Sequence, residues 1–180
     1  MARALIVVDI QNDYFPGGAH PLVGPEAAAA NARRLLDAFR AGGGELVHMQ
    51  HVWDAPDASF MRPGTAGVEI HESVAPLAGE TVIQKANPNS FLDTALEETL
   101  RAREVDEVVV CGMMTSMCVD ATARAASDLG FAVTVVHDAC AAPDLEFGGE
   151  TIPASQVHAA FLAALGGGYG AVVSTDDLVT

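Results

Sequence analysis

The sequence predicts a doubly wound α/β domain with a mainly parallel, six-stranded sheet and helices on both faces. The runs ALIVVDI at residues 4–10 and DEVVVCG at residues 106–112 are rich in Val, Ile and Leu, which is typical of strands buried on both faces of a parallel sheet. Such runs alternate with segments of helical periodicity, and this order favours a parallel sheet covered on both sides. The 180 residues contain no linker or internal repeat, so we expect a single domain over residues 1–180.

The first half of the chain supplies several of the expected strands and one long helix. The run at residues 4–10 forms the first strand and ends next to an acidic residue. Residues 25–44 place Ala, Leu and Phe at helical spacing and finish in three glycines, which predicts a helix with a glycine stop. Residues 45–52 and 81–85 are expected to be strands, whereas residues 53–80 are rich in Pro, Gly and Asp and indicate a long excursion between them.

The second half of the chain continues the alternation of strands and helices. Residues 90–103 are expected to be helical, with Ser90 as the N-cap. The strand at residues 106–112 is followed by an abrupt Gly-Met-Met turn and then by a helix over residues 115–130. The pattern closes with strands at residues 131–139 and 170–178 and a helix at residues 155–167.

Charge and composition exclude several classes of partner. The chain carries 24 acidic and 9 basic residues, a formal net charge of −15, which is unfavourable for binding nucleic acid or an anionic membrane. No apolar run is long enough to span a membrane, and the N-terminal segment lacks the small-residue cleavage site of a signal peptide. Three cysteines, an odd number, do not indicate a disulfide framework, so we expect a cytoplasmic protein.

Three reactive residues fall where doubly wound sheets bind their ligands, beyond the carboxyl ends of strands. Asp9 ends the first strand, Lys85 ends a later strand and is the only lysine of the chain, and Cys118 lies in the first turn of a helix. Unpaired N–H groups and the helix dipole at that terminus favour a thiolate. These residues predict a nucleophilic site in which Cys118 attacks a carbonyl, Lys85 stabilises the thiolate, and Asp9 accepts and returns the proton.

Each of these residues also has an ordinary structural explanation. An aspartate after a strand often caps a turn, a cysteine is often a small core residue, and lysine is scarce in a sequence this rich in Ala, Arg and Gly. Their convergence at one edge of the predicted sheet favours the catalytic interpretation. The backbone N–H groups of Met114 and Cys118 are then the candidates for an oxyanion hole.

Three motifs carry a resemblance to a known family. They are VVDIQNDYF with Asp9, QKANPNSF with Lys85, and CGMMTSMCVDATARAASDLGFAVTVVHDAC with Cys118. Over nearly its whole length the chain resembles the isochorismatase-like cysteine hydrolases, which include nicotinamidases and other small amide hydrolases. The resemblance implies a catalytic Asp-Lys-Cys triad, a homo-oligomer (a dimer or a tetramer), and a cis peptide bond between Met113 and Met114 that aims the N–H groups of the oxyanion hole.

The sequence departs from the metal-dependent members of that family. Nicotinamidases carry an Asp-x-His pattern after the second strand, where this chain reads QHVWD over residues 50–54. If His51 takes the place of the Asp, then Trp53, which is not a metal ligand, takes the place of the His. We therefore expect no metal at this site, and a backbone oxyanion hole needs no organic cofactor.

The sequence predicts a hydrolase that cleaves a small carboxamide or a related C–N bond through an acyl-enzyme on Cys118. Two alternatives stay open: a vinyl-ether hydrolase of the isochorismatase type with Asp9 as general acid, and a metal-dependent nicotinamidase. A nucleotide-binding module would need a glycine fingerprint after the first strand, which DIQNDYFPGG does not contain. Aromatic and polar side chains near the strand ends are candidates for binding the substrate: Gln11, Phe15, Trp53, Phe60, Phe91 and Met113.

Overall fold

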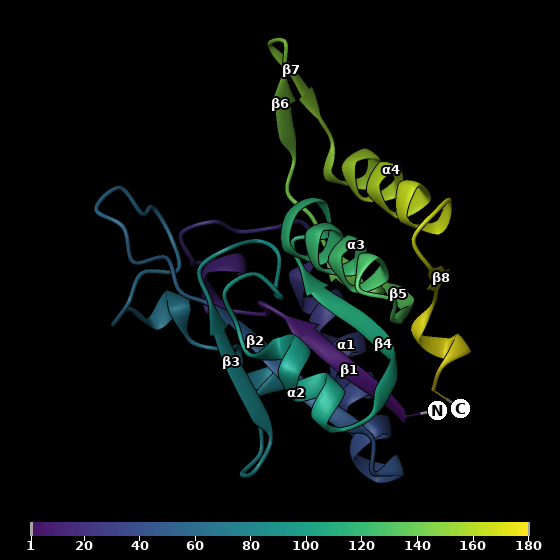
Figure 1. The fold of residues 1–180 in the computed structure, drawn as a ribbon. Helices are drawn as coiled ribbons and strands as arrows, with labels where there is room; N and C mark the ends of the chain where they lie inside the picture. Colours follow the sequence, from purple (N-terminus) through teal and green to yellow (C-terminus); the bar gives the residue numbers. More distant parts are fainter. Residues whose placement is uncertain (1, 180) are drawn as a thin grey trace.

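Parallel strands form the central sheet of the protein, whose computed structural model describes residues 2–179 (Figure 1). The sheet has six strands in the order β3-β2-β1-β4-β5-β8, and every neighbouring pair is parallel. This confirms the predicted fold class. The strands are β1 (Ala2–Val8), β2 (Glu45–His51), β3 (Thr81–Lys85), β4 (Val105–Met113), β5 (Ala132–Ala141) and β8 (Ala171–Val173).

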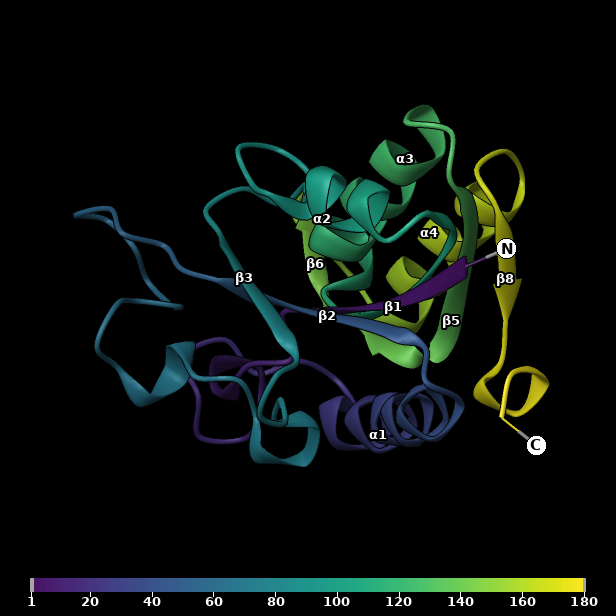
Figure 2. The same cartoon turned by 60° about the horizontal axis from the view of Figure 1, so that its bottom comes forward.

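Helices cover both faces of the sheet, as Figure 2 shows with α1 on one side and the others opposite. Alternate residues of β1 pack into the cores on the two faces of the sheet, because successive side chains of a strand point to opposite faces. Leu5 and Val7 pack in the core on the α1 side, whereas Ile6 and Val8 pack in the core of the other helices. The helices are α1 (Pro25–Gly42), α2 (Leu96–Ala102), α3 (Asp120–Asp128) and α4 (Ala154–Gly166).

The strand order reverses between β1 and β4. The chain winds outward from β1 through β2 to β3, then returns to the other side of β1 as β4 and continues to β5 and β8. Such a switch point leaves a crevice at the carboxyl ends of the two central strands, and ligands of open α/β sheets bind there. Gly112 allows β4 to approach β1 at this place, because its φ is +129° and a Cβ would collide with the carbonyl oxygen of Val8.

Some elements differ from the sequence-based expectation. The helix expected over residues 90–103 begins only at Leu96, because Asp93 has a left-handed backbone conformation with φ +56°. The hydroxyl of Ser90 accepts a hydrogen bond from Thr122 Oγ1 at 2.7 Å and does not cap a helix. The helix expected from residue 115 begins with a π-helical turn, Thr115–Val119, before α3. Short 3₁₀ turns lie within the loops at Asn12–Tyr14, Ala66–Val68, Glu72–Val74 and Thr175–Asp177.

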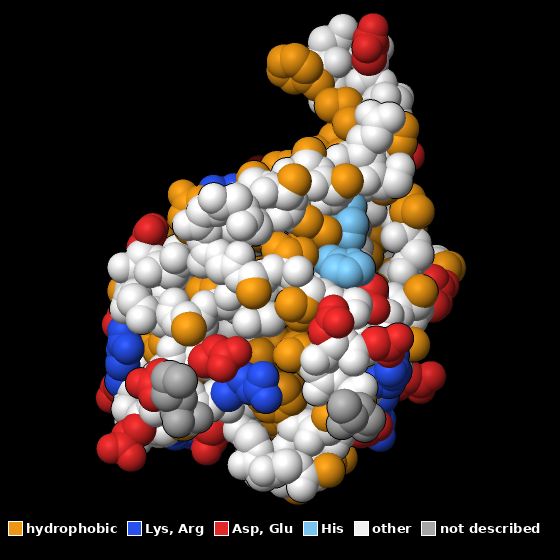
Figure 3. Space-filling view, turned by 90° about the vertical axis from the view of Figure 1, so that its right-hand side faces the viewer, with side chains coloured by type: hydrophobic (Ala, Val, Ile, Leu, Met, Phe, Trp, Pro, Cys, Tyr) orange, Lys and Arg blue, Asp and Glu red, His pale blue; other side chains and the backbone are white. Residues whose placement is uncertain are grey.

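A two-stranded hairpin that the sequence did not predict stands away from the body of the protein (Figures 1 and 3). Its strands, β6 (Leu145–Phe147) and β7 (Glu150–Ile152), pair antiparallel with each other and form a separate sheet. Phe147 is 80% exposed on this hairpin, which is unusual for so large an apolar side chain.

Over residues 2–179, no helix combines the length and the apolar character that crossing a membrane requires.

Candidate active site

The structure brings Asp9, Lys85 and Cys118 together at the switch point of the sheet. Asp9 directly follows β1, Lys85 is the last residue of β3, and Cys118 lies in the π-helical turn after β4. All three residues are at most 4% exposed. The ammonium Nζ of Lys85 lies 2.7 Å from Asp9 Oδ2, so the two form a fully buried ion pair. Cys118 Sγ lies within 4.8 Å of an Asp9 carboxylate oxygen.

The ammonium group of Lys85 is held by several acceptors. Beyond Asp9, its Nζ lies 3.1 Å from His51 Nδ1 and 3.0 Å from the carbonyl oxygen of Asn87, with the Pro88 carbonyl at 3.4 Å. An ammonium has three N–H donors and no acceptor, so these four acceptors outnumber its hydrogens and at least one hydrogen is shared. The positive charge of Lys85 is therefore fixed in place beside Asp9.

Burial decides the protonation of the two other triad residues. It raises the pKa of the Asp9 carboxyl more than the neighbouring Lys85 lowers it. Burial and the charge of Asp9 together raise the pKa of the Cys118 thiol well above its ordinary value, against the opposing charge of Lys85. This direction is opposite to the resting thiolate expected at a helix N-terminus, because desolvation and the charge of Asp9 both disfavour a charged sulfur.

The turn that carries Cys118 is held by its own backbone hydrogen bonds. The peptide bond between Met113 and Met114 is cis. The N–H groups of Met117 and Val119 both donate to the carbonyl of Met114, at 3.1 Å each, and Cys118 lies between them in the sequence. The hydroxyl of Thr115 lies 2.9 Å from His158 Nδ1 on α4, which anchors the start of the turn.

Gln11 fixes the end of β2 and does not line the pocket. Its Oε1 accepts from the backbone N–H of His51 at 2.8 Å, and its Nε2 donates to the carbonyls of His51 at 2.8 Å and Val68 at 2.7 Å. The side chain is fully buried. Gln11 was expected to bind substrate, but its side-chain amide is fully hydrogen-bonded to backbone groups of His51 and Val68. It therefore positions His51.

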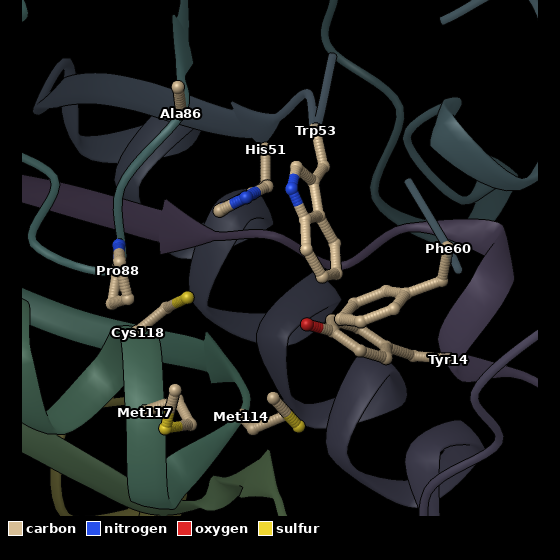
Figure 4. A pocket seen from close by; sticks show the side chains of 9 residues that line it. All are labelled: Tyr14, His51, Trp53, Phe60, Ala86, Pro88, Met114, Met117 and Cys118. Carbon is tan, nitrogen blue, oxygen red and sulfur yellow. The ribbon is translucent and has the colours of Figure 1, made fainter. Parts of the chain in front are cut away.

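An apolar pocket of about 210 Å³ opens above Cys118. The close-up of Figure 4 shows the Tyr14 hydroxyl pointing toward the centre of this pocket, with the indole of Trp53 and the ring of Phe60 on the same side. Trp53 and Phe60 meet edge to face, with ring centroids 5.5 Å apart. The lining residues are Tyr14, His51, Trp53, Phe60, Ala86, Pro88, Met114, Met117 and Cys118.

Three other residues expected in the pocket lie elsewhere. The ring of Phe15 stacks on His71 with a centroid distance of 3.7 Å, and Phe91 stacks on Phe131 at 6.0 Å. Met113 is fully buried in the core. Phe15 and Phe91 follow strands in sequence, but the local turns direct their side chains away from the crevice, and Met113 is the last residue of β4. Tyr14, which was not predicted from the sequence to bind substrate, lines the pocket where Phe15 was expected.

The residues present do not fit the metal site of nicotinamidases. Trp53 lines the pocket as an apolar wall, and His71 Nδ1 lies 2.9 Å from the hydroxyl of Ser73. Ligand atoms of Asp9, His51 and Cys118 do lie within 4.8 Å of one another. However, the Lys85 ammonium is 2.7 Å from Asp9 Oδ2 and 3.1 Å from His51 Nδ1, so a fixed cation already holds two of the three ligands.

A parallel sheet with these residues at its switch point defines the class: a doubly wound α/β protein with a buried Asp, Lys and Cys. The family model of the Isochorismatase domain matches residues 3–177, and the chain belongs to the isochorismatase family of hydrolases.

Similar proteins span the length of the chain. It is 51% identical over 176 residues to the uncharacterized isochorismatase family protein YddQ of Bacillus subtilis, covering 98% of each chain. It is 40% identical to a streptothricin hydrolase of Streptomyces noursei, covering 91% of this chain and 59% of that protein.

Two solved structures are informative. The putative isochorismatase hydrolase from Oleispira antarctica has a TM-score of 0.95 at 48% identity and covers 99% of this chain and 96% of its own. The N-carbamoylsarcosine amidase from Thermoplasma acidophilum has a TM-score of 0.82 at 27% identity, with 98% of each chain covered.

Proposed function

We propose that the protein is a cysteine amidohydrolase that cleaves a small, uncharged carboxamide or a related C–N bond through an acyl-enzyme on Cys118. The observation that carries this proposal is the buried Lys85–Asp9 ion pair, with Nζ and Oδ2 2.7 Å apart, placed beside Cys118 at an apolar pocket. A nucleophile, a proton acceptor and a fixed cation within one site are the parts that acyl transfer requires.

The raised pKa values of Asp9 and Cys118 suggest how the proton moves. As the sulfur attacks the carbonyl carbon, the thiol proton passes to Asp9, so that the thiolate forms only in the presence of substrate. Asp9 then gives this proton to the departing amine as the C–N bond breaks. A water molecule next attacks the thioester, Asp9 takes its proton, and the carboxylic acid leaves as Cys118 regains its hydrogen.

The fixed charge of Lys85 keeps Asp9 oriented and stabilises negative charge on the sulfur. The developing oxyanion is assigned to the N–H groups of Met114 and Cys118. This assignment is supported by the turn itself, in which Met117 and Val119 donate to the Met114 carbonyl on either side of Cys118. Backbone donors fixed before the reaction stabilise a developing oxyanion without reorganisation.

The pocket favours an amide over isochorismate. Isochorismate carries two carboxylates, and such a dianion needs cationic partners in a desolvated site. Among the nine lining residues there is no Arg or Lys, and the chain as a whole carries a net charge of −15. A neutral substrate with a planar or apolar body fits walls made by Tyr14, Trp53 and Phe60.

The names of relatives support C–N chemistry. One solved relative is an N-carbamoylsarcosine amidase, and a curated relative that is 28% identical is a ureidoacrylate amidohydrolase of Variovorax paradoxus.

A screen for ammonia release from small amides tests the proposal, with the Cys118→Ala protein as blank and each reaction run with and without a chelator. We expect release by the wild-type protein alone, unaffected by chelator, and a mass increase on Cys118 when the reaction is quenched early. Release that survives Cys118→Ala would contradict the acyl-enzyme. Release that the chelator abolishes would point to the nicotinamidase type of mechanism.

A further inference from the structure

His51 is a polar group of the pocket that the proposed reaction does not use. It is the last residue of β2, and its ring lines the cavity beside Cys118. Its Nδ1 lies 3.1 Å from Lys85 Nζ and 4.0 Å from Asp9 Oδ2. In Figure 4 the ring is seen above the Cys118 sulfur, with the Trp53 indole to its right.

The contact with Lys85 determines the tautomer of His51. An ammonium can only donate, so Nδ1 must accept and cannot itself carry a proton. The ring is neutral, because burial and the charge of Lys85 lower the pKa of His51 to about 4. In a neutral imidazole one nitrogen is protonated, and here it is Nε2. Lys85 thereby makes the other edge of the ring a hydrogen-bond donor.

The orientation of this donor is fixed by the backbone on which it stands. Gln11 holds the N–H and the carbonyl of His51, each at 2.8 Å, which fixes the end of β2. Apart from the Tyr14 hydroxyl, the remaining walls near Cys118 are largely apolar and include Ala86, Pro88 and Met114. A donor that opens into such a pocket gains most from an acceptor supplied by a bound molecule.

We propose that His51 is a specificity-determining residue whose Nε2–H donates a hydrogen bond to an oxygen of the substrate. This proposal rests on the proposed amidohydrolase function and narrows its substrate class. The substrate is a neutral carboxamide with an acceptor oxygen within reach of the reacting carbon. A cationic amine in the place of that oxygen is excluded, because its N–H donors would face the Nε2–H donor of His51.

Alkylation of Cys118 tests the proposal without any need for hydrolysis. Iodoacetamide and iodomethane both transfer carbon to the sulfur with loss of iodide, but only iodoacetamide carries a carbonyl acceptor. The rate constant for iodoacetamide divided by the rate constant for iodomethane gives a ratio in which changes in the reactivity of the thiol cancel. We expect this ratio to fall about three- to tenfold in His51→Leu, the range for one hydrogen bond, and to be retained in His51→Gln, which keeps a donor.

His71→Gln serves as the matched control, because His71 stacks on Phe15 and does not line this pocket. It should leave both rates unchanged. A ratio unchanged in His51→Leu overturns the proposal, as does an equal fall in His71→Gln. Neither result bears on amide hydrolysis, which the ammonia screen decides by itself.

The tautomer is measured separately in the wild-type protein. Long-range proton–nitrogen NMR spectra with isotope-labelled histidine distinguish the Nε2–H form from the Nδ1–H form, and the signal of His51 is assigned by its loss in His51→Gln. We expect the neutral Nε2–H form at neutral pH. A ring protonated on Nδ1, or a cationic ring, overturns the proposal even if the variants fail to fold.

Discussion

At the scale of single residues, the chemistry depends on where one proton lies between Asp9 and Cys118. Both groups are buried, and the pKa of each is raised. Lys85 lies 2.7 Å from Asp9, so its charge favours the ionised carboxylate as the proton acceptor. In the proposed mechanism the catalytic base is therefore an aspartate whose pKa is above its ordinary value, which brings it closer to the pH at which a general base is effective.

The pH dependence of turnover should report this aspartate. Asp9 must be ionised to accept the thiol proton, so kcat/KM should fall as the pH is lowered through the raised pKa of Asp9. The midpoint should lie above about 3.9, the ordinary value for aspartate. Asp9→Asn should lower kcat about 10²- to 10⁴-fold and remove this acidic limb. Steady-state kinetics on an amide found in the screen provides the measurement.

Asp54→Asn is the control for this profile, since Asp54 is an exposed acid next to Trp53. It should leave the midpoint where it is. An acidic limb that persists in Asp9→Asn would assign the titration to another group.

At the scale of elements, the positions of the triad residues could be predicted because each follows or ends a recognisable parallel strand. Continuous apolar runs mark the ends of the buried strands β1 and β4, whereas β3 is a short edge strand that alternates between exposed and less exposed residues, and the fold rule brings all three ends together. The direction of a side chain after a strand is set by the turn that follows. The 3₁₀ turn Asn12–Tyr14 places Tyr14 in the pocket and Phe15 against His71, and nothing in the local sequence distinguishes the two.

The resting state of Cys118 illustrates a second limit of local reasoning. The first turn of a helix favours a thiolate, and this contribution can be read from the sequence. The burial of the sulfur and the charge of Asp9, more than 100 positions away in the chain, act in the opposite direction and raise the pKa of the thiol. Such contributions exist only once the sheet has been assembled.

The segment that leads into β3 is anchored by Glu80. Its carboxylate accepts two hydrogen bonds from Arg40 of α1, one from Nε at 2.7 Å and one from Nη2 at 2.9 Å. It also lies 2.9 Å from His48 Nε2 on β2 and accepts from the backbone N–H of Leu77 at 2.9 Å. Arg40 is the main reason that the pKa of Glu80 is lowered to about 2. The network holds together the elements that place Lys85.

We expect Glu80→Gln to lower the free energy of unfolding by about 1–3 kcal/mol at neutral pH. A carboxyl whose folded pKa is depressed stabilises the protein above its unfolded pKa, about 4.3 for glutamate. That stability is lost as the pH falls from there toward about 2, the folded value. Urea denaturation of both proteins at a series of pH values should therefore show a difference that narrows in this window.

Asp37→Asn removes a half-exposed partner of Arg33 and Arg40 and should change stability by less than about 1 kcal/mol. If the free energies of unfolding of the wild-type protein and of Glu80→Gln differ by the same amount at all pH values, the loss of stability comes from packing and not from the charge.

At the scale of the whole molecule, the β6–β7 hairpin is the feature that a single chain does not explain. It projects from the body of the protein (Figures 1 and 3), and it pairs only with itself among the described strands. An isolated two-stranded hairpin is marginally stable in water. Leu145 is 37% and Phe147 80% exposed, so the hairpin presents apolar surface to the solvent.

We expect a second copy of the chain to cover this hairpin, giving a dimer or a tetramer. Burying a Phe side chain contributes about 1.5–3 kcal/mol, and symmetric contact between two copies counts this contribution at least twice. Phe147→Ser should therefore shift the mass measured by light scattering toward the monomer at micromolar concentration. Leu77→Ser, which changes an apolar residue 57% exposed on the loop before β3, should leave the mass unchanged. A wild-type monomer, or an equal shift in both variants, would show that the hairpin is not the interface.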